Sequence, residues 1–141
     1  MGLGRMLELK RRFAEGETPD INSIKGRYAV RLVTGLLPDI RFFGHSKFFP
    51  PDVTATGGGY NEFLGHVRLG NFRLEQQRSI LPDQEKVALI NYDRPGNPLP
   101  LKILKDELKE VGRDNYLGRG VFKLGPVKFK AFYFTLEKLN D

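Results

Sequence analysis

Alternation of polar and apolar residues through the second half of the chain is the feature that most constrains its fold. The alternating segments are 61–80, 86–93, 115–125 and 127–138. A period of two residues indicates β-strands with one face buried. Gly70–Asn71 lies inside the first segment and Gly125–Pro126 separates the last two, and both dipeptides are typical of tight turns. The pattern therefore predicts consecutive antiparallel hairpins.

The first half of the chain adds fewer regular elements. Residues 3–14 have the apolar spacing of a short helix, and segment 26–35 alternates like the later strands. The stretch 38–60 contains two Phe pairs, two adjacent prolines and three adjacent glycines. We therefore expect a long loop there, with a short helix or strand near 38–49.

The stretch 90–112, INYDRPGNPLPLKILKDELKEVG, changes character partway. A strand ends near Tyr92, and Asn97 followed by prolines is typical of a helix start. Leucines and a valine then follow at steps of three, four and three, which predicts a helix at about 98–111 with one apolar stripe. Gly112 is suited to end that helix. We expect the helix to cover the barrel or to plug one of its ends.

Together these elements amount to six or seven strands and two helices. A meander of antiparallel hairpins loses its exposed edges when the sheet closes on itself. We therefore expect one domain over 1–141 with a mainly β (α+β) fold. An N-terminal helix within 1–16 would precede an antiparallel meandering barrel over 26–138, with one helix inserted before the last hairpin. Apolar residues on both faces of the last strand predict a bulge near Ala131 or an outer face covered by a helix.

Composition limits the chemistry that is open to the chain. The 141 residues include no cysteine, which excludes disulfides, thiolate catalysis and cysteine-ligated zinc. The two histidines, His45 and His66, lack metal-site spacing, and the glycine-rich stretches match no nucleotide-binding motif. We therefore expect no metal and no cofactor.

The charge and the absence of long apolar runs bear on partners and location. No apolar run is long enough to span a bilayer and the first residues lack a signal-peptide core, so we expect a cytoplasmic protein. The net charge of +6 favours an anionic partner but does not choose among nucleic acid, a membrane surface and a small ligand. The oligomeric state stays open.

Two charged residues are the main candidates for a functional site. Asp106 lies beside the predicted apolar stripe and could turn inward toward Arg119 or Tyr116. There it would form an ion pair that holds the helix to the barrel, or act as a catalytic acid. Arg119 shares a strand face with Leu117 and Val121, which makes it a candidate for the barrel interior. A buried arginine needs a carboxylate or an anionic ligand.

Two family resemblances add to these predictions. The order of helix, KGRYAV strand, long loop, meander and final hairpin resembles a lipocalin-like (calycin) barrel, with Tyr28 where lipocalins usually carry Trp. That resemblance implies a cavity for a hydrophobic or amphipathic small molecule. The segment NYDRPGNPLPLKILKDELKEVGRDNYLGRG resembles uncharacterised prokaryotic proteins, which implies no known activity.

The leading hypothesis is a binding barrel, rather than an enzyme, that holds a hydrophobic or amphipathic, anionic small molecule. Arg119 would hold the anionic head group, and the Phe-rich segment 40–49 would gate the mouth together with the N-terminal helix. The expected ligand-binding residues are Arg119, Tyr116, Tyr133, Tyr92, Phe42 and Phe43.

Two alternatives stay open. An enzyme on the same barrel would use Asp106 with Tyr116 or Tyr92 for proton transfer on an organic acid. The last hairpin interleaves basic and aromatic residues, which is also typical of surfaces that bind single-stranded nucleic acid. A cavity of several hundred Å³ with one or two polar groups would favour ligand binding.

Overall fold

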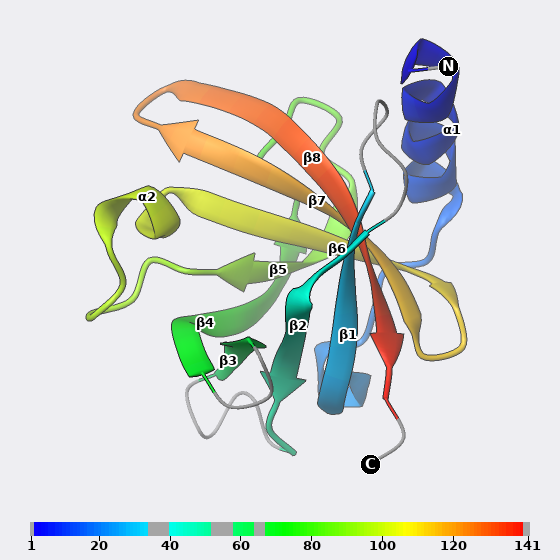
Figure 1. Ribbon diagram of the computed structural model, residues 1–141. Helices are drawn as coiled ribbons and strands as arrows, with labels where there is room; N and C mark the ends of the chain where they lie inside the picture. The colour runs from blue at the N-terminus through cyan, green and yellow to red at the C-terminus, as the bar shows by residue number, and fades with distance from the viewer. Residues whose placement is uncertain (1, 34–39, 52–57, 64–66, 140–141) are drawn as a thin grey trace.

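The computed structural model describes residues 2–33, 40–51, 58–63 and 67–139. Within them the chain forms an N-terminal helix, α1 (Gly2–Glu15), and eight strands that close into a barrel (Figure 1). The strands are β1 (Gly26–Val33), β2 (Ile40–Phe49), β3 (Gly59–Phe63), β4 (Val67–Arg78), β5 (Lys86–Asn91), β6 (Leu104–Gly112), β7 (Asn115–Leu124) and β8 (Val127–Lys138). Two helical turns complete the elements, η1 (Ile21–Ser23) before β1 and α2 (Leu99–Lys102) before β6.

The barrel is an antiparallel meander. Each strand pairs with the next strand in the sequence, and β8 returns to pair with β1. The predicted mainly β fold, the N-terminal helix and the closed antiparallel barrel are therefore confirmed. The strand number is eight rather than six or seven, because two segments form strands that the sequence pattern did not establish.

The predicted helix over 98–111 is wrong. Helical turn α2 ends at Lys102, and the next residues form strand β6 between β5 and β7. The same sequence also alternates with a period of two, so that Leu104, Asp106 and Leu108 face the barrel interior. Pairing along both edges favours the strand, because a helix here would leave the facing edges of β5 and β7 without partners.

The expected loop over 38–60 is wrong in part. Residues Ile40–Phe49 form β2, which is the strand allowed for near 38–49, and Gly59 begins β3. Of that stretch, residues 38–39 and 52–57 lie outside the described ranges. The paired Phe residues are therefore strand residues rather than loop residues.

One of the two expected turns is confirmed. Gly125 and Pro126 join β7 to β8, and Gly125 has the positive φ of 60° that the turn requires. The turn expected at Gly70–Asn71 is wrong, because β3 ends at Phe63 and β4 begins at Val67 and continues through both residues. Gly70 instead has a φ of 69° within the strand.

The predicted bulge near Ala131 is confirmed. Gly120 of β7 pairs with Phe132, whereas the next residue, Val121, pairs with Lys130, so that Ala131 is the additional residue of β8. Beyond the bulge, Phe132 and Phe134 pack inside the barrel. The expected covering helix is also present, since Tyr133 packs with the residues of α1 on the outside.

Aromatic rings fill one end of the barrel interior. Tyr28 contacts Tyr116 and Phe49 edge-on, with ring centroids 5.7 and 5.5 Å apart. Phe72 continues the cluster at 5.2 Å from Phe49 and 5.8 Å from Tyr92. All five rings are buried. Their packing leaves the opposite end of the interior as the place where a ligand can enter.

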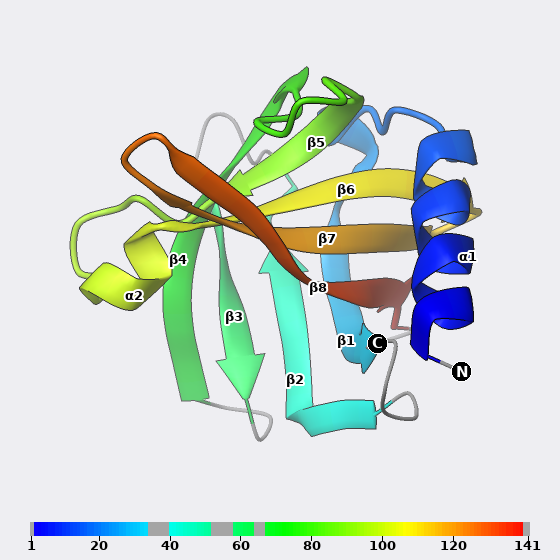
Figure 2. The ribbon, with the colours of Figure 1, turned by 90° about the horizontal axis from the view of Figure 1, so that it is seen from above.

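A second apolar layer lies outside the barrel, beneath α1. Leu9 and Phe13 of α1 are buried against outward-facing residues of five strands, including Val87, Leu117 and Tyr133. Figure 2 shows α1 lying across the ends of β6, β7 and β8. The helix therefore protects strand faces that would otherwise expose apolar side chains to water.

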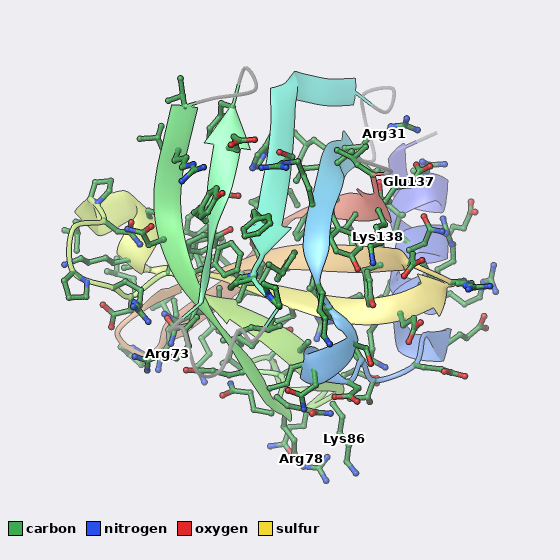
Figure 3. The ribbon with its side chains drawn as sticks, turned by 90° about the horizontal axis from the view of Figure 1, so that it is seen from below. Arg31, Arg73, Arg78, Lys86, Glu137 and Lys138 are labelled. Atoms are coloured by element: carbon green, nitrogen blue, oxygen red, sulfur yellow. The ribbon has the colours of Figure 1, made fainter. Side chains whose placement is uncertain are left out.

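Charged side chains cover much of the remaining outer surface. Figure 3 labels six of them on the outside of the barrel, namely Arg31, Arg73, Arg78, Lys86, Glu137 and Lys138. Neither α1 nor the short helical turns among the described residues are long and apolar enough to cross a membrane.

Candidate ligand-binding cavity

A cavity of about 670 Å³ lies in the barrel interior on the side of α2. Its apolar lining comes from strands and from α2, namely Val30, Leu32, Phe63, Leu101, Leu104, Phe132 and Phe134. Tyr92 marks the boundary, because its ring contacts the aromatic packing on one side and its residue lines the cavity on the other. The barrel interior is therefore packed with aromatic rings at one end and hollow at the other.

Two glycines of β7 make room for phenyl rings in the cavity wall. A Cβ atom at Gly118 would lie 2.2 Å from the ring of Phe134, and one at Gly120 would lie 2.3 Å from the ring of Phe132. Both distances are far below van der Waals contact, so a side chain at either position would displace a ring. Phe132 and Phe134 line the cavity.

A polar cluster interrupts the apolar lining. Its members are His45, Lys47, Asn61, Tyr92 and Asp106. They come from β2, β3 and β6 and from the end of β5, which are neighbours in the barrel apart from the intervening β4. Strand alternation places them inside, in the same way that it places the apolar residues beside them.

Lys47 is the centre of the cluster, and only 3% of its surface is exposed. Its ammonium donates to Asn61 Oδ1 at 2.6 Å and to the hydroxyl of Tyr92, and it lies 3.5 Å from Asp106 Oδ2. It also lies 5.1 Å from the centroid of the Tyr92 ring. A buried ammonium ion without such partners would be costly.

Asn61 joins Lys47 to the rim of the cavity. Its Oδ1 also accepts a hydrogen bond from Nε2 of His45 at 2.7 Å. Its Nδ2 donates to the backbone carbonyl of Gly70 at 3.1 Å and to the Tyr92 hydroxyl at 3.3 Å. Gly70 lies where the pairing of β3 with β4 shifts register, between the pairs Asn61–Leu69 and Gly59–Phe72. The amide group therefore has partners for all of its hydrogens and lone pairs.

Asp106 is the anion of the cluster and is 3% exposed. Its Oδ2 accepts from the Tyr92 hydroxyl at 3.0 Å and faces Lys47. Its Oδ1 is buried and has no hydrogen-bond partner among the described residues. The expected contacts with Arg119 or Tyr116 are not made, because Arg119 faces outward and Tyr116 pairs with Glu110, four positions from Asp106 along β6.

Burial shifts the ionisation of every titratable member of the cluster. Desolvation raises the pKa of Asp106, and the nearby Lys47 ammonium opposes that rise. Desolvation likewise lowers the pKa of Lys47, and Asp106 opposes the fall. The pKa of Tyr92 is raised well above its usual range by burial and by the Asp106 charge. Desolvation, together with the Lys47 charge, lowers the pKa of His45 to about 4. His45 is therefore neutral at pH 7.

The structure divides the expected site residues between the two faces of the barrel. Tyr92 and Asp106 line the cavity. Tyr116 faces inward but belongs to the packed aromatic end, where it contacts Tyr28. Tyr133 faces outward beneath α1.

The other two expected residues, Phe42 and Phe43, lie on β2. Their side chains are outside the described part of the structure.

Arg119 lies outside the cavity, which corrects the expectation that it faces the interior. Its guanidinium is buried beneath Phe13 of α1, 4.2 Å from the ring centroid. It donates to Glu107 Oε1 at 2.9 Å and to both carboxylate oxygens of Asp83 at 2.8 and 3.0 Å. Arg119 shares a face of β7 with Leu117 as predicted, but that face is the one that α1 covers. Two carboxylates therefore replace the expected anionic ligand.

Three cluster members were missed from the sequence, namely His45, Lys47 and Asn61. Each is a single polar residue in a segment that was expected to be a loop or that lacked a motif. A signal was present in β2, since Lys47 is two residues from both His45 and Phe49 and so shares their face once the strand is known. In the described part of the chain, no three His, Asp or Glu side chains gather closely enough to hold a metal ion.

Fold and cavity together define a class of protein, a closed eight-stranded antiparallel β-barrel with a partly hollow interior. Comparison with known proteins adds no relative, since no protein-family model, curated protein or solved structure matches the chain. Function must therefore be argued from the site itself.

Proposed function

We propose that the protein is a lipocalin-like binding barrel that holds a small hydrophobic or amphipathic molecule in its cavity. The apolar part of the ligand would lie against the phenyl and leucine walls, and its polar end would meet the cluster around Lys47 and Asp106. The observation that carries the proposal is the cavity itself. Its volume of about 670 Å³ and apolar lining with a few converging polar groups are typical of small-molecule sites.

We do not retain the anionic head group that the sequence led us to expect on the ligand. It rested on Arg119, whose charge is taken up by Glu107 and Asp83 outside the cavity. Inside the cavity, Lys47 and Asp106 balance each other when both are ionised. The polar end of the ligand is therefore argued from hydrogen bonding rather than from net charge.

The proposal can be tested by displacement of a neutral fluorescent probe, N-phenyl-1-naphthylamine, from delipidated protein, together with native mass spectrometry of the protein as purified. We expect saturable binding or a co-purified small molecule. Leu104→Trp should block binding by filling the cavity, because Leu104 lines it. Leu124→Trp adds similar bulk at an exposed position of β7 and should leave binding intact. Absence of both saturable binding and a co-purified molecule in the unmodified protein would refute the proposal.

A second candidate function, proton transfer by Asp106, is favoured by one specific observation. A buried carboxylate of raised pKa lies 3.0 Å from a tyrosine hydroxyl in a cavity that a substrate could enter. Asp106 would take a proton from carbon next to a carbonyl group and return it. Proton exchange of a medium-chain ketone in D₂O, followed by NMR, tests this function. Exchange should require Asp106, and equal exchange with Asp106→Asn would exclude it.

A further inference from the structure

The hydrogen-bonding capacity of the polar cluster is almost completely used within the cluster itself. An ammonium group has three hydrogens to donate. The ammonium of Lys47 donates to Asn61 Oδ1 and to the Tyr92 hydroxyl, and Asp106 Oδ2 lies 3.5 Å away as its ion-pair partner. Two of the three hydrogens are therefore in hydrogen bonds, and a ligand would compete with Asp106 for the third.

Two neutral members of the cluster, Tyr92 and Asn61, are also committed. Tyr92 donates its hydroxyl hydrogen to Asp106, and the oxygen accepts from Lys47 and from Asn61. Asn61 uses both amide hydrogens and receives hydrogen bonds from Lys47 and His45 at its oxygen. Neither side chain can accept or donate further without losing a present partner.

Asp106 Oδ1 is the buried atom of the cluster that has no partner among the described residues. It is buried, it belongs to a residue that lines the cavity, and the described part of the chain offers it no hydrogen-bond donor. Leaving a buried carboxylate oxygen without a donor is unfavourable, and native structures contain few such atoms. An ionised carboxylate can only accept, so the missing partner must be a donor.

We infer that the ligand's polar end is a hydrogen-bond donor, a hydroxyl or a protonated amine, that binds Oδ1 of Asp106. This inference rests on the proposed function and names the class of ligand, an apolar molecule that ends in a donor. A neutral hydroxyl fits best, because Lys47 already neutralises the carboxylate. A carboxylate head group would have to compete with Asp106 for the Lys47 ammonium and would be repelled by the Asp106 charge.

Arg68 is the cation that could favour an anion at the cavity rim. Its side chain is 65% exposed, lies 3.8 Å from Glu62 and stacks 4.6 Å from the Tyr60 ring centroid. A charge in that setting is screened by solvent and partly neutralised by Glu62. Binding of an anion at the rim is therefore a separate outcome that the experiment must detect.

A matched ligand series separates these possibilities with the unmodified protein. Octanol, octylamine, octanoate and methyl octyl ether share an apolar chain but differ in the polar end. We expect octanol or octylamine to displace N-phenyl-1-naphthylamine with an affinity roughly tenfold or more above that of the ether, which can only accept. Octanoate should bind no better than the ether. Comparison of octanol with octylamine then identifies the kind of donor.

Asp106→Asn gives the second arm of the test. The amide oxygen can still accept from Tyr92, while the amide NH₂ replaces the unpartnered oxygen by a donor. The preference should therefore disappear, because octanol and methyl octyl ether can both accept a hydrogen bond from the amide. If this variant does not fold, the ligand series on the unmodified protein still decides the inference.

Each outcome has a defined meaning. Equal affinity for octanol and methyl octyl ether, or tightest binding of octanoate, overturns the donor inference while leaving a ligand-binding barrel. Failure of all four compounds and of the probe to bind, together with the absence of a co-purified molecule, overturns the proposed function as well.

Discussion

Lys47 is the residue on which the polar cluster depends most. Its ammonium is 3% exposed and holds together the side chains of Asn61, Tyr92 and Asp106. Removing one member of a buried ion pair leaves the other charge uncompensated, and this costs more than the pair contributes. Single and paired substitutions can therefore distinguish a buried ion pair from two independent polar residues.

We predict that Lys47→Met lowers the free energy of unfolding by about 3–5 kcal/mol, because it leaves the Asp106 carboxylate buried without its cation. Urea denaturation followed by circular dichroism measures the change. The double variant Lys47→Met with Asp106→Asn should recover part of the loss, since it removes both charges. Additive effects of the two substitutions would contradict this coupling.

His45 predicts a pH dependence of stability. Its pKa falls from 6.5 to about 4 on folding, chiefly through desolvation, so the unfolded chain binds the proton more tightly. Its contribution is complete above pH 6.5 and is lost as the pH falls toward 4, by at most about 3 kcal/mol. The raised pKa of Asp106 acts in the opposite direction in acid. Urea midpoints of the unmodified protein and His45→Gln should therefore be compared between pH 4 and 8, and parallel curves would contradict the prediction.

Among the elements, strand β6 shows where sequence reasoning succeeds and where it fails. The leucine spacing around Leu104 and Leu108 satisfies a helix and a strand equally, because positions four apart share a face in both. The sequence alone could not decide, since the deciding interactions are hydrogen bonds to β5 and β7. Asp106 was identified as a residue of interest, but its direction depended on that choice.

Strands with a clear period of two were predicted well, because one buried face is a local property of the sequence. Barrel closure followed from the number of antiparallel hairpins. Pairing between distant strands is not a local property, and it decides which side of β7 lies beneath α1. That is why Arg119 was placed on the wrong side of the barrel wall.

The position of Arg119 outside the barrel, beneath α1, can be tested by substitution. We predict that Arg119→Met lowers the free energy of unfolding by about 3–5 kcal/mol, because Glu107 is 0% exposed and would lose its ion pair. The affinity of the folded protein for a cavity ligand should be unchanged, since Arg119 does not line the cavity. Denaturation and probe binding measured on the same variant check both parts. A loss of affinity without a loss of stability would restore Arg119 as a ligand residue.

For the molecule as a whole, the two apolar layers share the barrel wall. Leu117 and Tyr133 pack beneath α1, while Tyr116 and Phe134 on the same two strands pack inside. Loss of either layer therefore weakens the support of the other. A chain of this size with such a shared wall is expected to unfold in one cooperative step.

We predict that tyrosine fluorescence and far-ultraviolet circular dichroism report coincident unfolding transitions. A ligand that binds the cavity should raise the free energy of unfolding by about 2.7 kcal/mol at one hundred times its dissociation constant. Thermal unfolding at increasing octanol concentration measures this shift against methyl octyl ether as the reference. Fluorescence and circular dichroism transitions at different midpoints would show that α1 and the barrel are independent units.

Gly118 and Gly120 have a consequence for selectivity. The rings of Phe134 and Phe132 occupy the space where side chains on β7 would stand. A single methyl group at either glycine would move a ring toward the hollow half of the barrel and narrow it for thick, branched ligands before slender ones. The width of the cavity thus depends on two glycines that do not line it, because the absence of their side chains leaves room for the rings that do.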